Sequence, residues 1–199
     1  SKHFKLDFNE LESKITKKTK MMIFNSPHNP TGKVFTHDEI ENICEIVKKH
    51  DLILISDEVY ECMILSDLPH LHPATFDGMF ERTISIGSAG KTFSVTGWKV
   101  GWSIGPESLI SAMKFAHLMM AYCVHVPSQY AIKEGFQIAP TKNYYNEFAS
   151  TLKRNRDRIA SAFKEVGLNP IIPDGSYMML IDFSSLELPN ESPFFDDND

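Results

Sequence analysis

Short apolar runs flank a segment of helical periodicity in the first third of the chain. Residues 21–25 (MMIFN) and 52–56 (LILIS) are runs of the kind that buried parallel strands use. Between them, Thr36 and Glu39 form a capping-box pattern, and apolar residues then recur at helical spacing at positions 40, 43, 46 and 47. This order predicts a strand–helix–strand crossover unit.

Two more apolar runs follow, at residues 83–87 (TISIG) and 100–104 (VGWSI). Together the four runs predict an α/β fold class: a mixed, mostly parallel sheet with helices on both faces. Beyond Pro106 the spacing favours helices over residues 107–122, 128–138 and 143–166, and residues 177–183 (YMMLIDF) are expected to form one strand of a new unit. We expect residues 1–140 to belong to a large domain, 141–168 to form a bridging helix, and 169–199 to begin a small C-terminal domain with an acidic, frayed end.

Composition narrows the class of protein. Hydrophobic residues make up 42% and charged residues 23% of the 199, which is typical of a folded globular chain. The net charge is -6 and no basic stripe is present, so nucleic acid is not an expected partner. No apolar stretch approaches the roughly 20 residues of a membrane span, and the three cysteines form no Cys-x-x-Cys pair. We expect no membrane partner and a cytoplasmic location, with a mitochondrial leader left open.

The string Gly-Lys-Thr at residues 90–92 raises the question of a nucleotide-binding loop. A phosphate loop of the form Gly-x-x-x-x-Gly-Lys-[Ser/Thr] would need its first glycine at position 85, where Ser85 stands. Ser85 also falls inside an apolar run, where such a loop should already have begun. The pattern therefore argues against ATP binding, and Lys91 needs another explanation.

Polar residues follow the predicted strands at one rim of the sheet. Asn29 follows the first strand, Asp57 and Tyr60 the second, and Ser88 and Lys91 the third. Ligands of open α/β sheets bind outside the carboxyl ends of the strands, so these side chains are expected to surround one ligand. The set contains no hydrolytic triad and no metal cage, and we predict no metal site.

The same set suits pyridoxal 5'-phosphate as a cofactor. Lys91 would form a Schiff base and Asp57 would keep the pyridine nitrogen protonated. Tyr60 and Asn29 would hydrogen-bond the phenolic oxygen. The phosphate would be held by Ser88 and by a sixth residue, Lys99.

Three motifs now resemble a known family: NSPHNPTGKVF, SDEVYE and GSAGKTFSVTGWKVGW. In their order and spacing they are similar to class I aminotransferases of the pyridoxal-phosphate fold type I, and within them to kynurenine and glutamine–phenylpyruvate aminotransferases, which also act as cysteine-S-conjugate β-lyases. The resemblance extends to about residue 183. Many class I relatives have arginine where Lys99 stands, and the form Gly-Trp-Lys is typical of the kynurenine and glutamine branch.

The resemblance implies the large domain of fold type I, the same roles for the six residues, and a homodimer in the full-length protein. It implies transfer of an amino group from an amino acid, such as kynurenine or glutamine, to a 2-oxo acid, with lyase activity as a side reaction. Family members are roughly twice as long, and they carry a ring-stacking aromatic upstream and a carboxylate-binding arginine downstream. We therefore expect this chain to be a fragment that is inactive alone; the alternative is a non-catalytic remnant or an assembly partner of an intact subunit.

Five of the six candidate residues also have a purely structural interpretation. Lys91 could be a surface lysine, Asp57 could cap a following helix with Glu58 sharing that duty, and Tyr60 could simply pack. Asn29 before a proline and Ser88 could both be turn residues. The pair His70 and His72 could present two imidazoles to a metal, but with no third ligand evident in the sequence we expect them on a loop surface.

Overall fold

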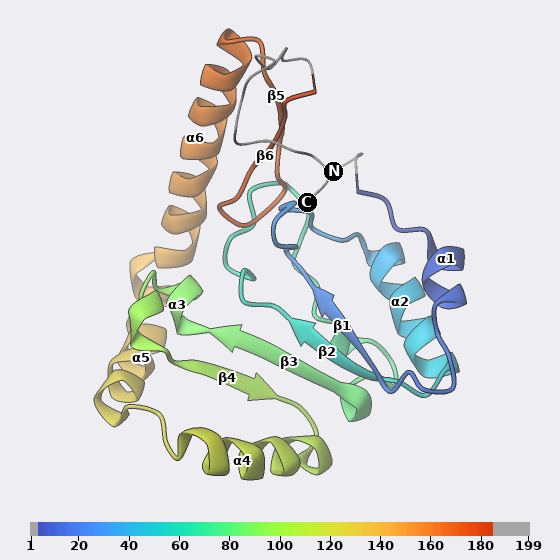
Figure 1. Cartoon of the computed structure of the whole chain (residues 1–199). Coiled ribbons are helices and arrows are strands. Elements are labelled where there is room, and N and C mark those ends of the chain that lie inside the picture. The colour runs from blue at the N-terminus through green and yellow to red at the C-terminus, as the bar shows by residue number, and fades with distance from the viewer. Residues whose placement is uncertain (1–3, 185–199) are drawn as a thin grey trace, which may run out of the picture.

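A four-stranded mixed sheet forms the centre of the molecule (Figure 1). The computed structural model describes residues 4–184, and its strands lie in the order β1 (Met21–Asn25), β2 (Ile53–Asp57), β3 (Thr83–Ser88) and β4 (Gly101–Ile104). The first three strands are parallel and β4 is antiparallel to β3. The predicted α/β class with a mixed, mostly parallel sheet is confirmed.

Helices and short 3-10 turns connect and follow these strands. The α-helices are α1 (Phe8–Ser13), α2 (His37–Lys49), α3 (Ala89–Thr92), α4 (Glu107–Ala121), α5 (Val126–Ile138) and α6 (Tyr144–Glu165). The 3-10 turns are η1 (Pro73–Thr75), η2 (Phe80–Arg82), η3 (Thr96–Trp98) and η4 (Pro140–Lys142). In the described chain no helix is long and apolar enough to cross a membrane.

Helix α2 covers one face of the sheet. Its N-terminus is the predicted capping box, in which the Thr36 side chain accepts from the Glu39 backbone and the Glu39 side chain accepts from the Thr36 backbone. The apolar side of α2 packs with Phe24 of β1 and Leu54 of β2 in one buried cluster. Burying this apolar stripe against the strands is what stabilises the crossover unit.

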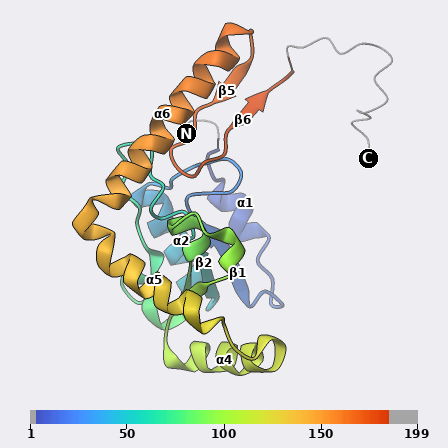
Figure 2. The same cartoon turned by 90° about the vertical axis from the view of Figure 1, so that its left-hand side faces the viewer.

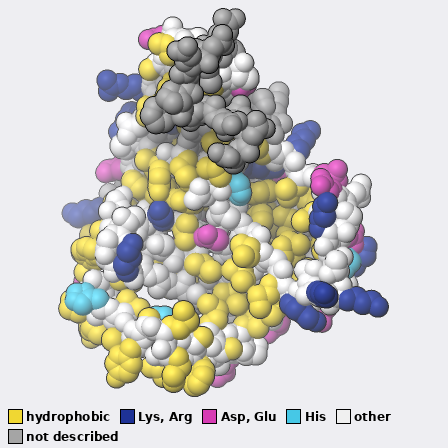
Figure 3. Space-filling model, viewed as in Figure 1, with side chains coloured by type: hydrophobic (Ala, Val, Ile, Leu, Met, Phe, Trp, Pro, Cys, Tyr) yellow, Lys and Arg dark blue, Asp and Glu magenta, His cyan; other side chains and the backbone are white. Residues whose placement is uncertain are grey.

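The opposite face of β1 is open. Residues 21 and 23 point away from Phe24 because side chains alternate along a strand, and Met21 and Ile23 are 55% and 75% exposed. The expected helix cover on this second face is therefore absent over β1 within residues 4–184. Helix α4 likewise buries none of its residues, and Met120 near its end is 87% exposed. Figure 3 shows hydrophobic side chains gathered over the strands and along the edge formed by α4.

The C-terminal part differs most from the prediction. Figure 2 shows α6 leading away from α4 toward a two-stranded sheet at the other end of the molecule. That sheet pairs β5 (Asn169–Ile171) with β6 (Leu180–Asp182) in antiparallel register. The single strand expected over residues 177–183 is thus shortened to three residues, and β5 was missed because Pro170 interrupts any strand pattern there. The acidic end, NESPFFDDND, lies outside the described residues, and the division into two domains and a bridging helix stays a prediction.

Candidate active site

Lys91 lies just beyond the end of β3. The strand ends at Ser88, and the next four residues form α3, whose first turn is closed by a bond from the Thr92 hydroxyl to the Ser88 carbonyl at 3.2 Å. Ser85 is inside β3, where it pairs with Ile104. Gly-Lys-Thr therefore forms this short helix, and the residue that would begin a phosphate loop lies within the strand.

Three of the six predicted site residues line one cavity. Ser88, Lys91 and Lys99 surround a space of about 400 Å³ beside β3. Lys99 has a left-handed backbone with φ of 54°, at the end of the turn η3. This backbone is uncommon for a residue with a side chain, so the surrounding structure must hold it. The cavity thus offers two primary amines and the hydroxyls of Ser88 and Thr96 within one small space.

Asp57 and Tyr60 lie on the neighbouring strand and turn. Asp57 is the last residue of β2, one position later than the predicted strand end, and it pairs in register with Ile86, which lines the cavity. Its Oδ1 accepts from the Val59 backbone at 3.3 Å, so the carboxylate supports a turn. The Tyr60 side chain is buried, and its ring centroid lies 5.5 Å from Lys91 Nζ.

Asn29 is placed differently from the other five. Its backbone donates to Asn25 Oδ1 at 2.6 Å in the turn after β1, and with Asn25 and His28 it lines a separate cavity of about 410 Å³. These contacts agree with the alternative of a turn residue. A role beside the phenolic oxygen stays a prediction for Asn29.

Tyr177, which no sequence motif marks as a site residue, contacts Lys91. Lys91 Nζ donates to the Tyr177 hydroxyl at 2.9 Å, and the rings of Tyr60 and Tyr177 meet edge to face with centroids 5.7 Å apart. The bond to Tyr177 raises the pKa of Lys91. The same bond lowers the pKa of Tyr177. Tyr177 lies 86 positions from Lys91 in the chain, so no local motif joins the two.

Replacing Tyr177 with phenylalanine is expected to make Lys91 more reactive toward an aldehyde. The variant removes the hydroxyl that stabilises the charged amine, so more Lys91 is neutral at a given pH, and only the neutral amine attacks a carbonyl. We expect the rate of imine formation with pyridoxal phosphate at pH 7.5 to rise about threefold, a size typical of one solvated hydrogen bond. Stopped-flow absorbance measures this rate. Tyr130→Phe, on an exposed tyrosine of α5, is the control, and an equal or lower rate in Tyr177→Phe would contradict the prediction.

A cluster of three polar side chains begins at the residue that follows Asp57. We call Glu58, His70 and His72 the Glu58 cluster. His70 Nε2 lies 2.9 Å from Glu58 Oε2, and His72 Nδ1 contacts the same oxygen. The His70 and Glu58 side chains are only 7% and 3% exposed, so the expectation of a loop-surface histidine is wrong for His70. In the sequence Glu58 stands out only as a possible helix cap, so no local pattern marks it as the partner of His70 and His72.

Direct hydrogen bonds describe the Glu58 cluster better than metal coordination. Two ligands of one zinc ion stand roughly 3.3 Å apart, because each metal–ligand bond is about 2.1 Å long in a tetrahedral site. Both nitrogens are closer than that to a single carboxylate oxygen. Glu58 Oε2 thus contacts both imidazoles directly, whereas Glu58 Oε1 and His70 Nδ1 are buried without a hydrogen-bond partner in the described residues.

The donors around Lys91 fit pyridoxal phosphate chemically. A primary amine matches the aldehyde, and a hydroxyl with a second amine matches the phosphate. Gly90 also lines this cavity, and a Cβ there would lie 3.0 Å from Thr96 Cα, so the backbone packs closely at this wall. The donor set of this cavity is therefore chemically compatible with pyridoxal phosphate.

Comparison with known proteins places the chain in a family. The profile for aminotransferases of class I and II matches residues 1–196, so the chain belongs to that family, which depends on pyridoxal phosphate. Among its relatives, the kynurenine–oxoglutarate transaminase of Dictyostelium discoideum is 44% identical over 193 residues, which are 96% of this chain and 44% of that protein. Human kynurenine–oxoglutarate transaminase 3 is 45% identical over 204 residues, covering 98% of this chain and 45% of the relative.

Solved structures agree with this membership. The structure of Bna3p from Saccharomyces cerevisiae is 36% identical and superposes with a TM-score of 0.89 over 96% of this chain and 45% of that one. The chain thus spans about half the length of the relatives it matches. The resemblance to the aminotransferase family, and to its kynurenine branch, is confirmed.

Proposed function

We propose that this chain carries the pyridoxal-phosphate site of an aminotransferase that moves an amino group from an amino acid, such as kynurenine or glutamine, to a 2-oxo acid. The observation that carries the proposal is the cavity shared by Lys91, Ser88 and Lys99, with Asp57 on the adjacent strand. Pyridoxal phosphate, when bound, supplies an aldehyde that condenses with amines and a ring that withdraws electrons from the substrate's α-carbon.

Each residue of the site has a defined task in this proposal. Lys91 Nζ would hold the cofactor covalently and, once released, carry the substrate α-proton. Asp57 would hold a proton on the pyridine nitrogen, and Ser88 and Lys99 would bind the phosphate. Tyr60, which lies beside Lys91, would donate to the phenolic oxygen, with Asn29 as the second donor.

The names of similar proteins indicate which substrates to test first. Several similar proteins are named kynurenine–oxoglutarate transaminases, which makes kynurenine and 2-oxoglutarate the first pair to test. A substrate with a leaving group on its β-carbon would lose that group after the same removal of the α-proton. A cysteine-S-conjugate lyase side activity is therefore part of the proposal, as is a homodimer of the whole protein.

A second candidate function rests on the exposed apolar surface. Ile23 on β1 and Phe115 and Met120 on α4 are 75%, 66% and 87% exposed. Patches of this kind mark surfaces that another chain covers. The second candidate is therefore a non-catalytic chain that associates through this surface with an intact aminotransferase subunit.

One experiment separates the two functions. The matching region of human kynurenine–oxoglutarate transaminase 3 is replaced with this chain, and the hybrid and the 199-residue chain alone are assayed with kynurenine and 2-oxoglutarate. We expect the hybrid to transaminate and the chain alone to be inactive. Robust turnover by the chain alone would refute the non-catalytic function. A folded, cofactor-binding hybrid without turnover would refute the aminotransferase proposal.

A further inference from the structure

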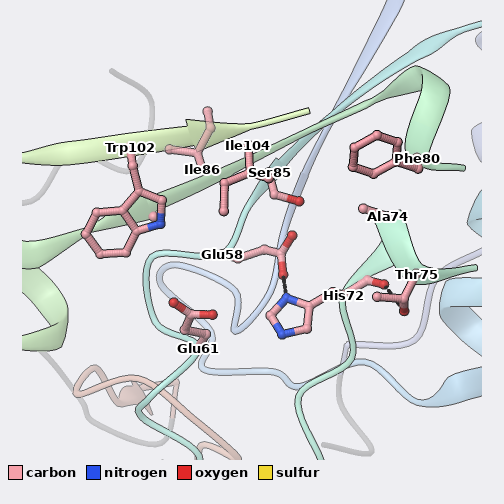
Figure 4. A pocket seen from close by; sticks show the side chains of 11 residues that line it. Glu58, Glu61, His72, Ala74, Thr75, Phe80, Ser85, Ile86, Trp102 and Ile104 are labelled. Carbon is pink, nitrogen blue, oxygen red and sulfur yellow. Dashed lines mark hydrogen bonds and ion pairs between the residues drawn. The ribbon is translucent and has the colours of Figure 1, made fainter. Parts of the chain in front are cut away.

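The Glu58 cluster has no task in the proposed function. The buried Glu58 carboxylate lines a further cavity, of about 260 Å³, next to β3. Figure 4 shows this cavity, in which Glu58 contacts His72, and Ser85 and Trp102 form other parts of the wall. Burying a carboxylate is costly unless it is hydrogen-bonded, and here two imidazoles from a segment 12 and 14 residues further along provide those bonds. A buried carboxylate with two imidazole partners therefore calls for a structural or functional explanation.

The position of Glu58 in the chain suggests that reason. Glu58 directly follows Asp57, and its backbone donates to the Ile86 carbonyl at 3.0 Å, which fastens the end of β2 to β3. The turn continues with bonds from Glu61 to the Glu58 carbonyl at 2.9 Å and from Met63 to the Tyr60 carbonyl at 2.8 Å. Residues 57–63 therefore form one hydrogen-bonded turn, and the Glu58 side chain holds that turn to the segment around His70.

We propose that Glu58 is a positioning residue, which through His70 and His72 holds the turn that presents Asp57 and Tyr60 to the cofactor. The inference rests on the proposed function, because it assigns to the cluster the placement of two cofactor-binding groups. The Glu58 side chain lines the cavity of about 260 Å³, whereas Lys91 lines the separate cavity of about 400 Å³. Glu58 therefore acts on the cofactor site through the backbone of its neighbours.

At low pH, the attraction between ionised Glu58 and protonated His72 strengthens the contact between the turn and the His70–His72 segment. Burial alone would raise the pKa of Glu58, but hydrogen bonds from His70 and His72 outweigh it and lower the pKa to about 2. The bond to Glu58 raises the pKa of the half-exposed His72 above its usual 6.5. Glu61 is the other titratable side chain that lines the cavity in the described chain, and burial raises its pKa. Because the pKa of His72 is raised, the attraction is complete below pH 6.5 and is lost as the pH rises through the raised value.

Amide hydrogen exchange of the 199-residue chain without cofactor tests the hold directly. In Glu58→Gln we expect the protected amides of Glu58, Glu61 and Met63 to exchange about tenfold faster, while the amides of α2 are unchanged. Affinity for pyridoxal phosphate, measured by absorbance titration, should fall by a similar factor. Glu61→Gln, in the same cavity but outside the cluster, is the matched control and should change neither quantity.

A second variant covers the case in which Glu58→Gln unfolds, which faster exchange in α2 would reveal. His72→Gln changes a side chain that is 46% exposed. We expect residues 58–63 of the wild type to loosen between pH 6 and pH 8.5, and His72→Gln should abolish that pH dependence. If, in both variants, the amides of residues 58–63 exchange faster only to the extent that the amides of α2 do, the proposal is overturned. It is also overturned if the turn loosens while the affinity for pyridoxal phosphate stays unchanged. Failure of the wild type to bind cofactor would count against the proposed function alone, because the exchange is measured without it.

Discussion

Lys91→Ala is expected to abolish the covalent attachment of pyridoxal phosphate to the chain. Of the two amines that line the cavity, Lys91 Nζ is the one beside the Tyr60 ring, and an imine requires a primary amine at the aldehyde. Incubation with cofactor followed by borohydride reduction should label the wild-type peptide that contains Lys91. The variant should lose at least about 90% of that label and the visible absorbance band of the bound cofactor, because alanine offers no amine.

Lys99→Ala is the informative comparison for this result. Lys99 lines the same cavity, and its proposed partner is the phosphate, so its loss should weaken binding about tenfold and leave the label on Lys91 at saturating cofactor. Labelling spread evenly over surface lysines in the wild type, or an unchanged label in Lys91→Ala, would contradict the role of Lys91. The pair of variants thus separates covalent attachment from phosphate binding.

Local patterns were enough to predict the sheet. The strands β1 and β3 begin where the apolar runs begin, and the helix between β1 and β2 starts at the predicted Thr36 cap. These features depend on neighbours in sequence: a buried strand needs a short apolar run, and a helix N-terminus needs a side chain that accepts from its free amides. The strand ends then brought Asp57, Ser88 and Lys91 to one rim, as expected for parallel strands.

Long-range contacts were out of reach of the same reasoning. Tyr177 meets Lys91, and His70 meets Glu58, because the chain folds back over 86 and 12 residues. Nothing in the local spacing of these residues encodes that return. A tyrosine after a Gly-Ser turn and a histidine in a proline-rich loop each have common structural explanations, and only the tertiary arrangement distinguishes them.

Gly32→Ala is expected to destabilise the fold more than any other glycine substitution considered for this chain. Gly32 has φ of +66°, and an added Cβ would lie 2.2 Å from Pro173 Cβ and 2.7 Å from the Gly175 carbonyl oxygen. The left-handed backbone costs a residue with a side chain about 1–2 kcal/mol, and overpacking adds about 1–3 kcal/mol. The total of about 3 kcal/mol should lower the thermal midpoint by roughly 6–12 °C for a chain of this size.

Two other glycines divide this loss into its causes. Gly97 has open space and an ordinary backbone, so Gly97→Ala should be nearly neutral, whereas Gly167, with φ of +81° and open space, should show the backbone strain alone. Urea unfolding of the three variants measures the difference. If Gly32→Ala costs no more than Gly167→Ala, then the contact between the Asn29 turn and residues 173–175 is not tight.

That contact matters for the site as well as for stability. The Gly32 carbonyl accepts from the Asp174 and Gly175 backbones at 2.9 and 2.8 Å. Gly175 lies two residues before Tyr177 in the chain. We expect a Cβ at Gly32 to push residues 173–175 away and thereby to withdraw the Tyr177 hydroxyl from Lys91. The folded fraction of Gly32→Ala should therefore react with pyridoxal phosphate at the faster rate expected for Tyr177→Phe, and Gly167→Ala should react at the wild-type rate. A wild-type rate in folded Gly32→Ala would show that the Tyr177 contact does not depend on this junction.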